Sequence, residues 1–174
     1  MDKKADDLIK LAKQGNADAQ FELGDRYYRG IGVKRDLKQA VMWLTKAAEQ
    51  GNAVAQYNLG FCYYNGEGVT QNYKQAIEWY TKAAEQGNAT AQNRLGICYY
   101  FNIYVKRDFK QAVFWYTKAA EQGNADAQNN LGNCYHNGDG VKQDYDKAVF
   151  WYTKAAEQGS TDAQYNLDNC YRRS

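Results

Sequence analysis

A chain of 174 residues with no proline, 44% hydrophobic residues and a near balance of 22 basic and 20 acidic side chains has the composition of one helical domain. Since both signs are mixed along the chain and the net charge is only +2, no field of one sign is available to attract nucleic acid or an anionic membrane. We therefore expect neither as a partner.

Targeting signals are not visible in the sequence. No segment approaches the roughly 20 consecutive apolar residues of a membrane span. Charged residues from Asp2 to Lys4 stand where a signal peptide would begin its apolar core. We expect a cytoplasmic protein, or a secreted one only if a leader has been removed.

Two sequence motifs recur at an interval of 36 residues. The first begins with glycine, at Gly15, Gly51, Gly87, Gly123 and Gly159. The second carries a tryptophan, at Trp43, Trp79, Trp115 and Trp151. A period of about 20 to 50 residues is typical of stacked units, none of which can bury its apolar face alone. We therefore predict an all-α solenoid forming one domain over 1–174: a capping helix (1–15), full repeats (16–51, 52–87, 88–123 and 124–159) and a half repeat (160–174).

The first predicted helix, residues 2–14, lacks the recurring tryptophan. It carries Leu8, Leu11 and Ala12 as one apolar stripe among charges. Because the end of a solenoid must present a face that water tolerates, we interpret this helix as a polar cap. At the far end Asp168 replaces a recurring glycine, so the half repeat is interpreted as the second cap.

The first helix of each repeat is predicted to begin after a Gly-Asn pair. Gly15 suits the left-handed conformation that ends one helix, and Asn16 is a favoured N-cap for the next. An apolar face follows at Ala19, Leu23 and Tyr27. We expect the tyrosines equivalent to Tyr27 to be core residues: Tyr27, Tyr63, Tyr99, Tyr135 and Tyr171.

A glycine stands inside these first helices, where it costs about 0.5 to 1 kcal/mol relative to alanine. The series is Gly24, Gly60, Gly96 and Gly132. We expect a close approach of the second helix, whose tryptophan needs room, to compensate for this cost.

The second helix of each repeat is predicted to begin after an N-cap, at Asp36, Asn72, Asp108 and Asp144. A glutamine three residues later completes a capping box in the first three repeats, at Gln39, Gln75 and Gln111. Apolar residues cover a wide arc of this helix: Ala40, Val41, Trp43, Leu44, Ala47 and Ala48. So wide an arc predicts a helix packed on two sides.

The cysteines also follow the repeat, at Cys62, Cys98, Cys134 and Cys170. Equivalent positions on packed helices lie about 8 to 10 Å apart, whereas a disulfide requires Cα atoms about 4.4 to 6.8 Å apart. Four thiols in a row along successive helices cannot converge on one tetrahedral zinc ion either. We expect reduced thiols and a reducing compartment.

The loop of the third repeat departs from the pattern. Where the first repeat has Gly30-Ile31-Gly32, the third has Asn102-Ile103-Tyr104. Because tyrosine adopts a left-handed conformation only at a cost, we expect this loop to follow a different path. Two interpretations of its exposed Phe101, Ile103 and Tyr104 stay open: local repacking, or a contact with a partner or with a second copy that gives a weak homo-oligomer.

The chain resembles the Sel1-like repeats, which are relatives of the tetratricopeptide repeats. The motifs that carry the resemblance are Ala-x-Ala-Gln-x-x-Leu-Gly-x-x-Tyr, Gly-x-Gly-Val and Trp-x-x-Lys-Ala-Ala-Glu-Gln-Gly. The resemblance covers nearly the whole chain. It implies an α/α right-handed superhelix that serves as a scaffold for protein partners, with the first helices lining its concave face.

Residues for catalysis are scarce. Only two serines are present, Ser160 and Ser174, and one histidine, His136, which replaces a recurring tyrosine. Cys134 and His136 are two residues apart on a helix and point in different directions, which weakens them as a nucleophile pair or a chelate. The Gly-rich loops lack the preceding strand of a phosphate-binding motif. We expect no enzyme, no metal and no cofactor.

The resemblance also implies which first-helix positions face the groove, namely those of Asp18, Phe21, Asp25, Tyr28 and Arg29 in the first repeat. From these positions the expected partner-binding residues are Phe21, Asp25, Tyr28, Tyr57, Phe61, Tyr64, Asn93, Ile97, Tyr100, Phe101, Asn129, Asn133 and His136. The set is aromatic in the middle repeats and polar near the C-terminus, which suits an extended or helical peptide with central apolar anchors.

The function expected from the sequence is a non-enzymatic scaffold that binds a peptide or protein partner. A self-assembling structural solenoid is the alternative, and an enzyme is a weaker one. Packing of Phe61 on Ile97 without any ligand is the alternative for the groove residues.

Overall fold

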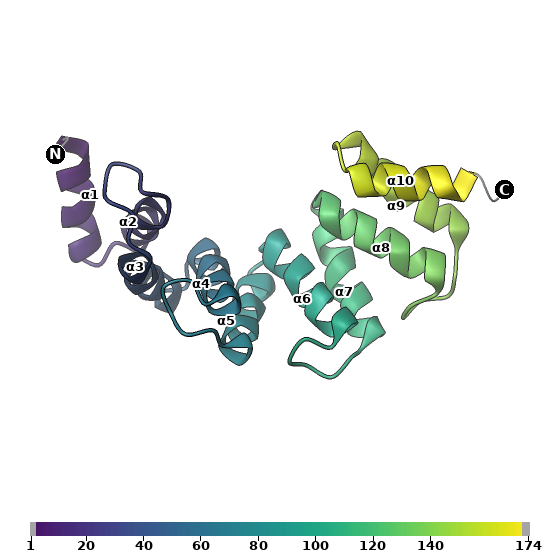
Figure 1. Ribbon diagram of the computed structural model, residues 1–174, viewed down its shortest axis with the longest axis horizontal. Coiled ribbons are helices and arrows are strands. Elements are labelled where there is room, and N and C mark those ends of the chain that lie inside the picture. Colours follow the sequence, from purple (N-terminus) through teal and green to yellow (C-terminus); the bar gives the residue numbers. More distant parts are fainter. Residues whose placement is uncertain (1–2, 172–174) are drawn as a thin grey trace. The chain divides into compact units, whose positions relative to one another are not determined.

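The computed structural model describes residues 3–171, and within this range the chain forms ten α-helices and no strand (Figure 1). The helices are α1 (Lys3–Lys13), α2 (Ala17–Arg29), α3 (Leu37–Glu49), α4 (Ala53–Asn65), α5 (Tyr73–Glu85), α6 (Ala89–Phe101), α7 (Phe109–Glu121), α8 (Ala125–Asn137), α9 (Tyr145–Glu157) and α10 (Thr161–Tyr171). The two helices predicted for each repeat are confirmed.

The helices group into two compact units, Met1–Asn88 and Ala89–Ser174. In the first unit α2 packs on α3 and α4 on α5, while α3 also packs on α4. In the second unit α6 packs on α7 and α8 on α9, while α7 also packs on α8 and α9 on α10. That all 174 residues form one domain stays a prediction.

The predicted helix starts are confirmed by their side-chain caps. Asn16 Oδ1 accepts the N–H of Ala19 at 2.8 Å, and Asp36 Oδ1 accepts the N–H of Gln39 at 3.0 Å. The later copies repeat the second bond, from Gln75 to Asn72, from Gln111 to Asp108 and from Lys147 to Asp144. Gly15 has a φ of +96°, the left-handed conformation predicted for it.

The wide apolar arc of α3 is confirmed, since all of its predicted residues are buried: Ala40, Val41, Trp43, Leu44, Ala47 and Ala48. The apolar stripe predicted for α1 is wrong in one residue. Leu8 and Ala12 are buried, but Leu11 is 48% exposed. The reason is that α1 packs mainly on α2, so only a narrow stripe of its surface is covered.

Close approach to the interior glycines is confirmed, but the approaching side chain is not the tryptophan. A Cβ on Gly60 would lie 2.7 Å from Cδ1 of Tyr80 and 3.1 Å from the carbonyl oxygen of Ala76. Equivalent tyrosines lie over the later glycines, at Tyr116 and Tyr152. These tyrosines are fully buried, whereas Trp79 is only half-buried.

The tyrosines predicted to be core residues lie instead at the edge of the core. Tyr27, Tyr63, Tyr99 and Tyr135 pack against buried clusters but are partly exposed. The side chain of Tyr171 lies outside the described residues.

The third loop follows the same path as the others, which contradicts the expectation. Asn102 and Tyr104 have φ values of +60° and +56°, close to the +74° and +71° of Gly30 and Gly32. The Ile103 N–H donates to the Cys98 carbonyl at 3.0 Å, as the Ile31 N–H does to Arg26. The backbone hydrogen bonds that end the helix therefore hold Asn102 and Tyr104 in the left-handed conformation. This conformation is strained for residues other than glycine.

Candidate partner-binding groove

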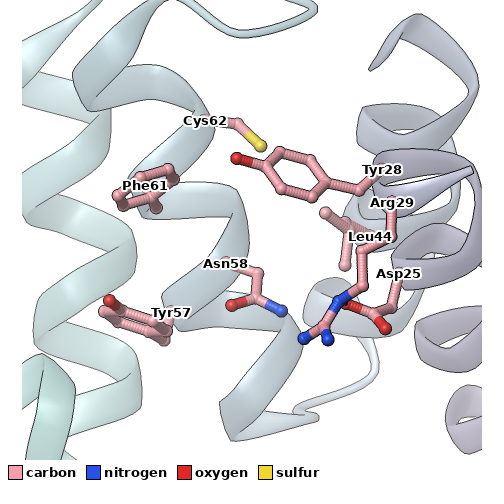
Figure 2. A pocket seen from close by; sticks show the side chains of 8 residues that line it. All are labelled: Asp25, Tyr28, Arg29, Leu44, Tyr57, Asn58, Phe61 and Cys62. Atoms are coloured by element: carbon pink, nitrogen blue, oxygen red, sulfur yellow. The ribbon is translucent and has the colours of Figure 1, made fainter. Parts of the chain in front are cut away.

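The first helices of the first unit, α2 and α4, enclose a pocket of about 240 Å³ that we call the α2/α4 pocket (Figure 2). Its lining residues are Asp25, Tyr28, Arg29, Leu44, Tyr57, Asn58, Phe61 and Cys62. Figure 2 shows Asn58 and Cys62 of α4 directed toward the side chains of α2, whereas Tyr57 and Phe61 lie on the other side of α4 in this view. The pocket therefore opens between two successive first helices, as the resemblance implies.

Helical spacing gathers these side chains. On α2, Asp25, Tyr28 and Arg29 stand at i, i+3 and i+4, so they share one face of the helix. On α4, Tyr57 and Phe61 are four residues apart and share a face in the same way. The recurrence of these spacings in every copy explains why the sequence could locate this surface.

The α2/α4 pocket has an apolar floor and a charged rim. Leu44 and Cys62 are almost completely buried beneath it. Tyr57 packs on Tyr80 with ring centroids 5.8 Å apart, which fixes the orientation of its ring. At the rim, Arg29 Nε donates to Asp25 Oδ1 at 2.9 Å across one turn of α2.

Two ionisable groups in the pocket, Tyr28 and Cys62, are held in their protonated forms. Burial, followed by the hydrogen bond from Tyr28 to Glu67, raises the pKa of Tyr28 to about 12. Burial, with the negative charge of Glu67 adding to it, raises the pKa of the Cys62 thiol to about 12. At neutral pH the pocket therefore presents a phenol and a thiol, not a thiolate nucleophile.

The second unit contains two further pockets between its first helices. One, of about 230 Å³, is lined by Tyr100, Phe101, Tyr116, Asn130, Asn133 and Asn137. The other, of about 200 Å³, is lined by Asn93, Arg94, Ile97, Asp126, Asn129, Asn130, Ser160 and Asp162, and we call it the Arg94 pocket. Both are more polar than the α2/α4 pocket because asparagines replace aromatic residues in these helices.

Asparagine side chains connect the first helices of the second unit. Asn130 Nδ2 donates to Asn93 Oδ1 at 3.0 Å, which joins α8 to α6. Asn166 Nδ2 donates to Asn129 Oδ1 at 2.9 Å, which joins α10 to α8. Each bond uses only part of the hydrogen-bonding capacity of the two amides.

Most of the predicted partner-binding residues line one of these three pockets. Those that do are Asp25, Tyr28, Tyr57, Phe61, Asn93, Ile97, Tyr100, Phe101, Asn129 and Asn133. Phe21 packs instead on the core cluster around Leu59. Tyr64 packs edge-on against Tyr73, and His136 against Tyr145. Whether any of these residues binds a partner stays a prediction.

Sequence reasoning missed several lining residues. Leu44 belongs to the packed arc of its helix and Cys62 recurs along the repeats, so nothing in the sequence marks them as pocket residues. Asn58, Arg94 and Asn130 occupy one position that varies between copies. That variation was the available signal, whereas the predicted residues were taken from the groove positions that the resemblance implies.

The described part of the chain holds no cluster of three or more His, Cys, Asp or Glu side chains that could bind a metal ion. Among the same residues, no helix has the length and apolar character needed to cross a bilayer.

The repeats match a known family along most of the chain. The sequence model of the Sel1 repeat matches residues 17–52, 53–88, 89–124 and 125–160, one residue later than the predicted repeat boundaries. The chain belongs to the Sel1 repeat family. A Sel1-like repeat-containing protein of Acanthamoeba polyphaga mimivirus is 49% identical over 39 residues, which are 22% of this chain and 7% of that protein.

Solved Sel1 repeat structures confirm the all-α solenoid fold. The structure of c5321, a protective antigen present in uropathogenic Escherichia coli strains, is 46% identical with a TM-score of 0.93, covering 97% of this chain and 36% of that one. A Sel1 repeat protein from Oxalobacter formigenes is 42% identical with a TM-score of 0.85, covering 91% and 65%. Cysteine rich protein B of Helicobacter pylori is 30% identical with a TM-score of 0.60, covering 79% and 99%.

This Sel1 repeat chain spans only about a third of the c5321 chain and under two thirds of the Oxalobacter chain. The Sel1 repeat is a helical fold that commonly serves as a protein-interaction scaffold.

Proposed function

We propose that this protein is a non-enzymatic scaffold that binds a peptide segment of a protein partner along its first helices, with an apolar side chain of the peptide anchored in the α2/α4 pocket. The observation that carries the proposal is the pocket itself, in which an apolar floor and two aromatic side chains, Tyr57 and Phe61, lie beside a polar rim.

The size of the pocket favours a side chain over a small-molecule ligand. Sites for small molecules and cofactors usually enclose about 300 to 1,000 Å³. The α2/α4 pocket encloses about 240 Å³, which is enough for one large apolar side chain. Aromatic pockets of this kind carry much of the binding energy in protein interfaces.

The rim can hold the backbone of the same peptide. The Asn58 side chain offers a carbonyl oxygen and an NH₂ group, which match the N–H and C=O groups of an extended chain. Arg29 and Asp25 lie at the opposite wall and offer charges of both signs. A peptide with an apolar anchor flanked by polar residues is the ligand that fits this arrangement.

Self-association is a second candidate because of one observation in the third loop. Phe101 is 61% exposed and Tyr104 is 71% exposed, although large aromatic side chains are normally covered. Light scattering at several concentrations tests this candidate. A constant monomer mass would exclude it, and a mass that rises with concentration and falls for Tyr104→Gly would support it.

Selection from a random peptide library on the immobilised protein tests the proposed function. We expect the selected peptides to share an apolar residue, and Phe61→Ala to weaken their binding about thirtyfold or more, as for an interface hot spot. Phe150→Ala is the matched control, since Phe150 is 50% exposed on α9 and lies outside these pockets. Equal affinities for the two variants would show that the α2/α4 pocket is not the site.

A further inference from the structure

Arg94, which lines the Arg94 pocket, carries a buried polar atom without a hydrogen-bond partner. This atom is Nε, which is shielded from solvent. In the described part of the chain the Arg94 guanidinium also forms no ion pair. Leaving a buried charged donor unsatisfied is costly, so such a group in a pocket indicates a missing acceptor.

Arg94 is also an exception within the repeats. The equivalent positions in the other first helices are occupied by Glu22, Asn58, Asn130 and Asn166. The fold therefore accepts asparagine at this position, and packing does not require an arginine there. A long cationic side chain in this one copy has to be explained by something other than the stability of the helix pair.

The side chains around Arg94 can assist an acceptor. Asn130 uses its Nδ2 in the bond to Asn93, and Asn129 uses its Oδ1 in the bond from Asn166. The remaining Nδ2 of Asn129 can therefore donate to a ligand in the Arg94 pocket, beside the five N–H donors of the guanidinium. A carboxylate is the acceptor that such planar donor groups bind best.

We propose that the Arg94 pocket binds a carboxylate of the peptide partner. The inference rests on the proposed function in one respect, namely that the ligand is a protein segment. The carboxylate can be an acidic side chain or the C-terminal group of the peptide. Asp126 and Asp162 are exposed at the rim of the same pocket, so a basic residue beside the carboxylate is favoured over a second acidic one.

Titration with sodium acetate tests the carboxylate directly, without any peptide. In the ¹⁵N spectrum of the whole protein, we expect the Nε–H signal of Arg94 to shift saturably with acetate but not with chloride at equal ionic strength. The exposed Arg107 is the matched control in the same unit, and its signal should not saturate. An Arg94 signal that moves no more than that of Arg107 would overturn the inference.

The variant Arg94→Asn restores the residue found at three equivalent positions, so it should keep the helicity and melting temperature of the wild type. We expect the side-chain amide signal of Asn129 to stop responding to acetate in this variant. Neutralising the rim with Asp126→Asn and Asp162→Asn should increase acetate affinity about twofold or more, since repulsion is removed. A response to acetate that survives in Arg94→Asn would contradict the assignment.

Peptide binding separates the two sources of the carboxylate. Peptides selected from libraries with free and with amidated C-termini should bind Arg94→Asn about tenfold more weakly than wild type, and Arg107→Asn equally well. Selection from both libraries indicates an acidic side chain, and selection only from the free one indicates the terminal carboxylate. Binding that is lost in Phe61→Ala but kept in Arg94→Asn would overturn this inference alone. If no peptide binds at all, the proposed function fails and the acetate titration still decides whether Arg94 binds a carboxylate.

Discussion

The hydroxyl of Tyr28 donates a 2.5 Å hydrogen bond to the carboxylate of Glu67, 39 residues later in the chain. The bond joins the first helix of one repeat to the loop of the next. Tyr100 makes the same bond to Asp139 at 2.6 Å, again 39 residues later. Since the stability of a repeat array depends on the interfaces between neighbours, these two bonds are expected to couple adjacent repeats.

Removing the Tyr28 hydroxyl should weaken the first unit. We expect Tyr28→Phe to lower the free energy of unfolding by about 1 kcal/mol, since a hydrogen bond to a charged acceptor is lost at a partly exposed site. Urea unfolding followed by circular dichroism measures this change. Tyr165→Phe is the control, because Tyr165 is 69% exposed. Equal midpoints for the two variants would show that the bond contributes nothing.

The same tyrosine makes stability fall at high pH. Burial and the hydrogen bond to Glu67 raise the pKa of Tyr28 from 10.0 to about 12 in the folded protein. Between these values the unfolded chain releases the proton and the folded chain keeps it, so the contribution is present below pH 10 and is lost as pH rises toward 12. We expect urea midpoints of the wild type to fall over this window, and less steeply in Tyr28→Phe. Parallel pH profiles would contradict this expectation.

Two loop glycines with the same backbone conformation should differ in tolerance. Gly32 and Gly68 have φ values of +71° and +74°, so alanine strains both equally. A Cβ on Gly68 would collide with the carbonyl group of Leu37, whereas the nearest atom to a Cβ on Gly32 is 4.0 Å away. We expect Gly68→Ala to destabilise the protein by about 1 to 3 kcal/mol more than Gly32→Ala in thermal unfolding. Equal losses would mean that the loop moves away freely.

The strain in the third loop can be measured by removing it. Tyr104→Gly should raise the free energy of unfolding by about 1 kcal/mol, because glycine adopts the left-handed conformation without the Cβ penalty. Asn102→Gly is not expected to stabilise, since Asn102 Oδ1 accepts the N–H of Arg107 at 3.0 Å and that bond would be lost. A Tyr104→Gly variant that is less stable than wild type would show that the tyrosine ring contributes more than the strain costs.

The elements predicted correctly from sequence were those decided by neighbouring residues. Asp36 caps α3 because its carboxylate reaches N–H groups two and three residues later, and local spacing is enough to predict that. The recurring glycines and tryptophans placed the repeats in the same way. Tyr57 and Phe61, which line the α2/α4 pocket, were assigned to the groove from the positions that the family resemblance implies.

The errors arose where contacts with other helices determine the burial or conformation of a residue. Leu11 is exposed because α1 has too little neighbouring surface to cover it, which no local pattern reveals. The residue over Gly60 is Tyr80, since the crossing of α4 and α5 selects it over Trp79. Tyr104 keeps the path of a glycine because two backbone hydrogen bonds at the end of the preceding helix outweigh its own preference.

The buried thiols should be protected from reagents in the folded state. Burial raises the pKa of Cys62 and Cys134 to about 12, and that of Cys98 to about 11, while all three side chains are almost inaccessible. Cys170 is only half-buried. At pH 8 we expect a thiol reagent to modify Cys170 first and the other three cysteines only as the protein unfolds. In urea without reductant, the reagent should detect all four thiols. A count of zero or two in urea would reveal disulfides.

Photo-crosslinking at the α2/α4 pocket tests the proposed function most directly. The photoreactive amino acid p-benzoylphenylalanine is placed at Phe61 in one variant and at Phe150 in another, and each is irradiated with a labelled peptide selected on the wild-type protein. The account predicts a crosslink from position 61, mapped by mass spectrometry to the apolar anchor of the peptide, and none from position 150. A crosslink from position 150 alone, or an equal yield from both positions, would contradict it.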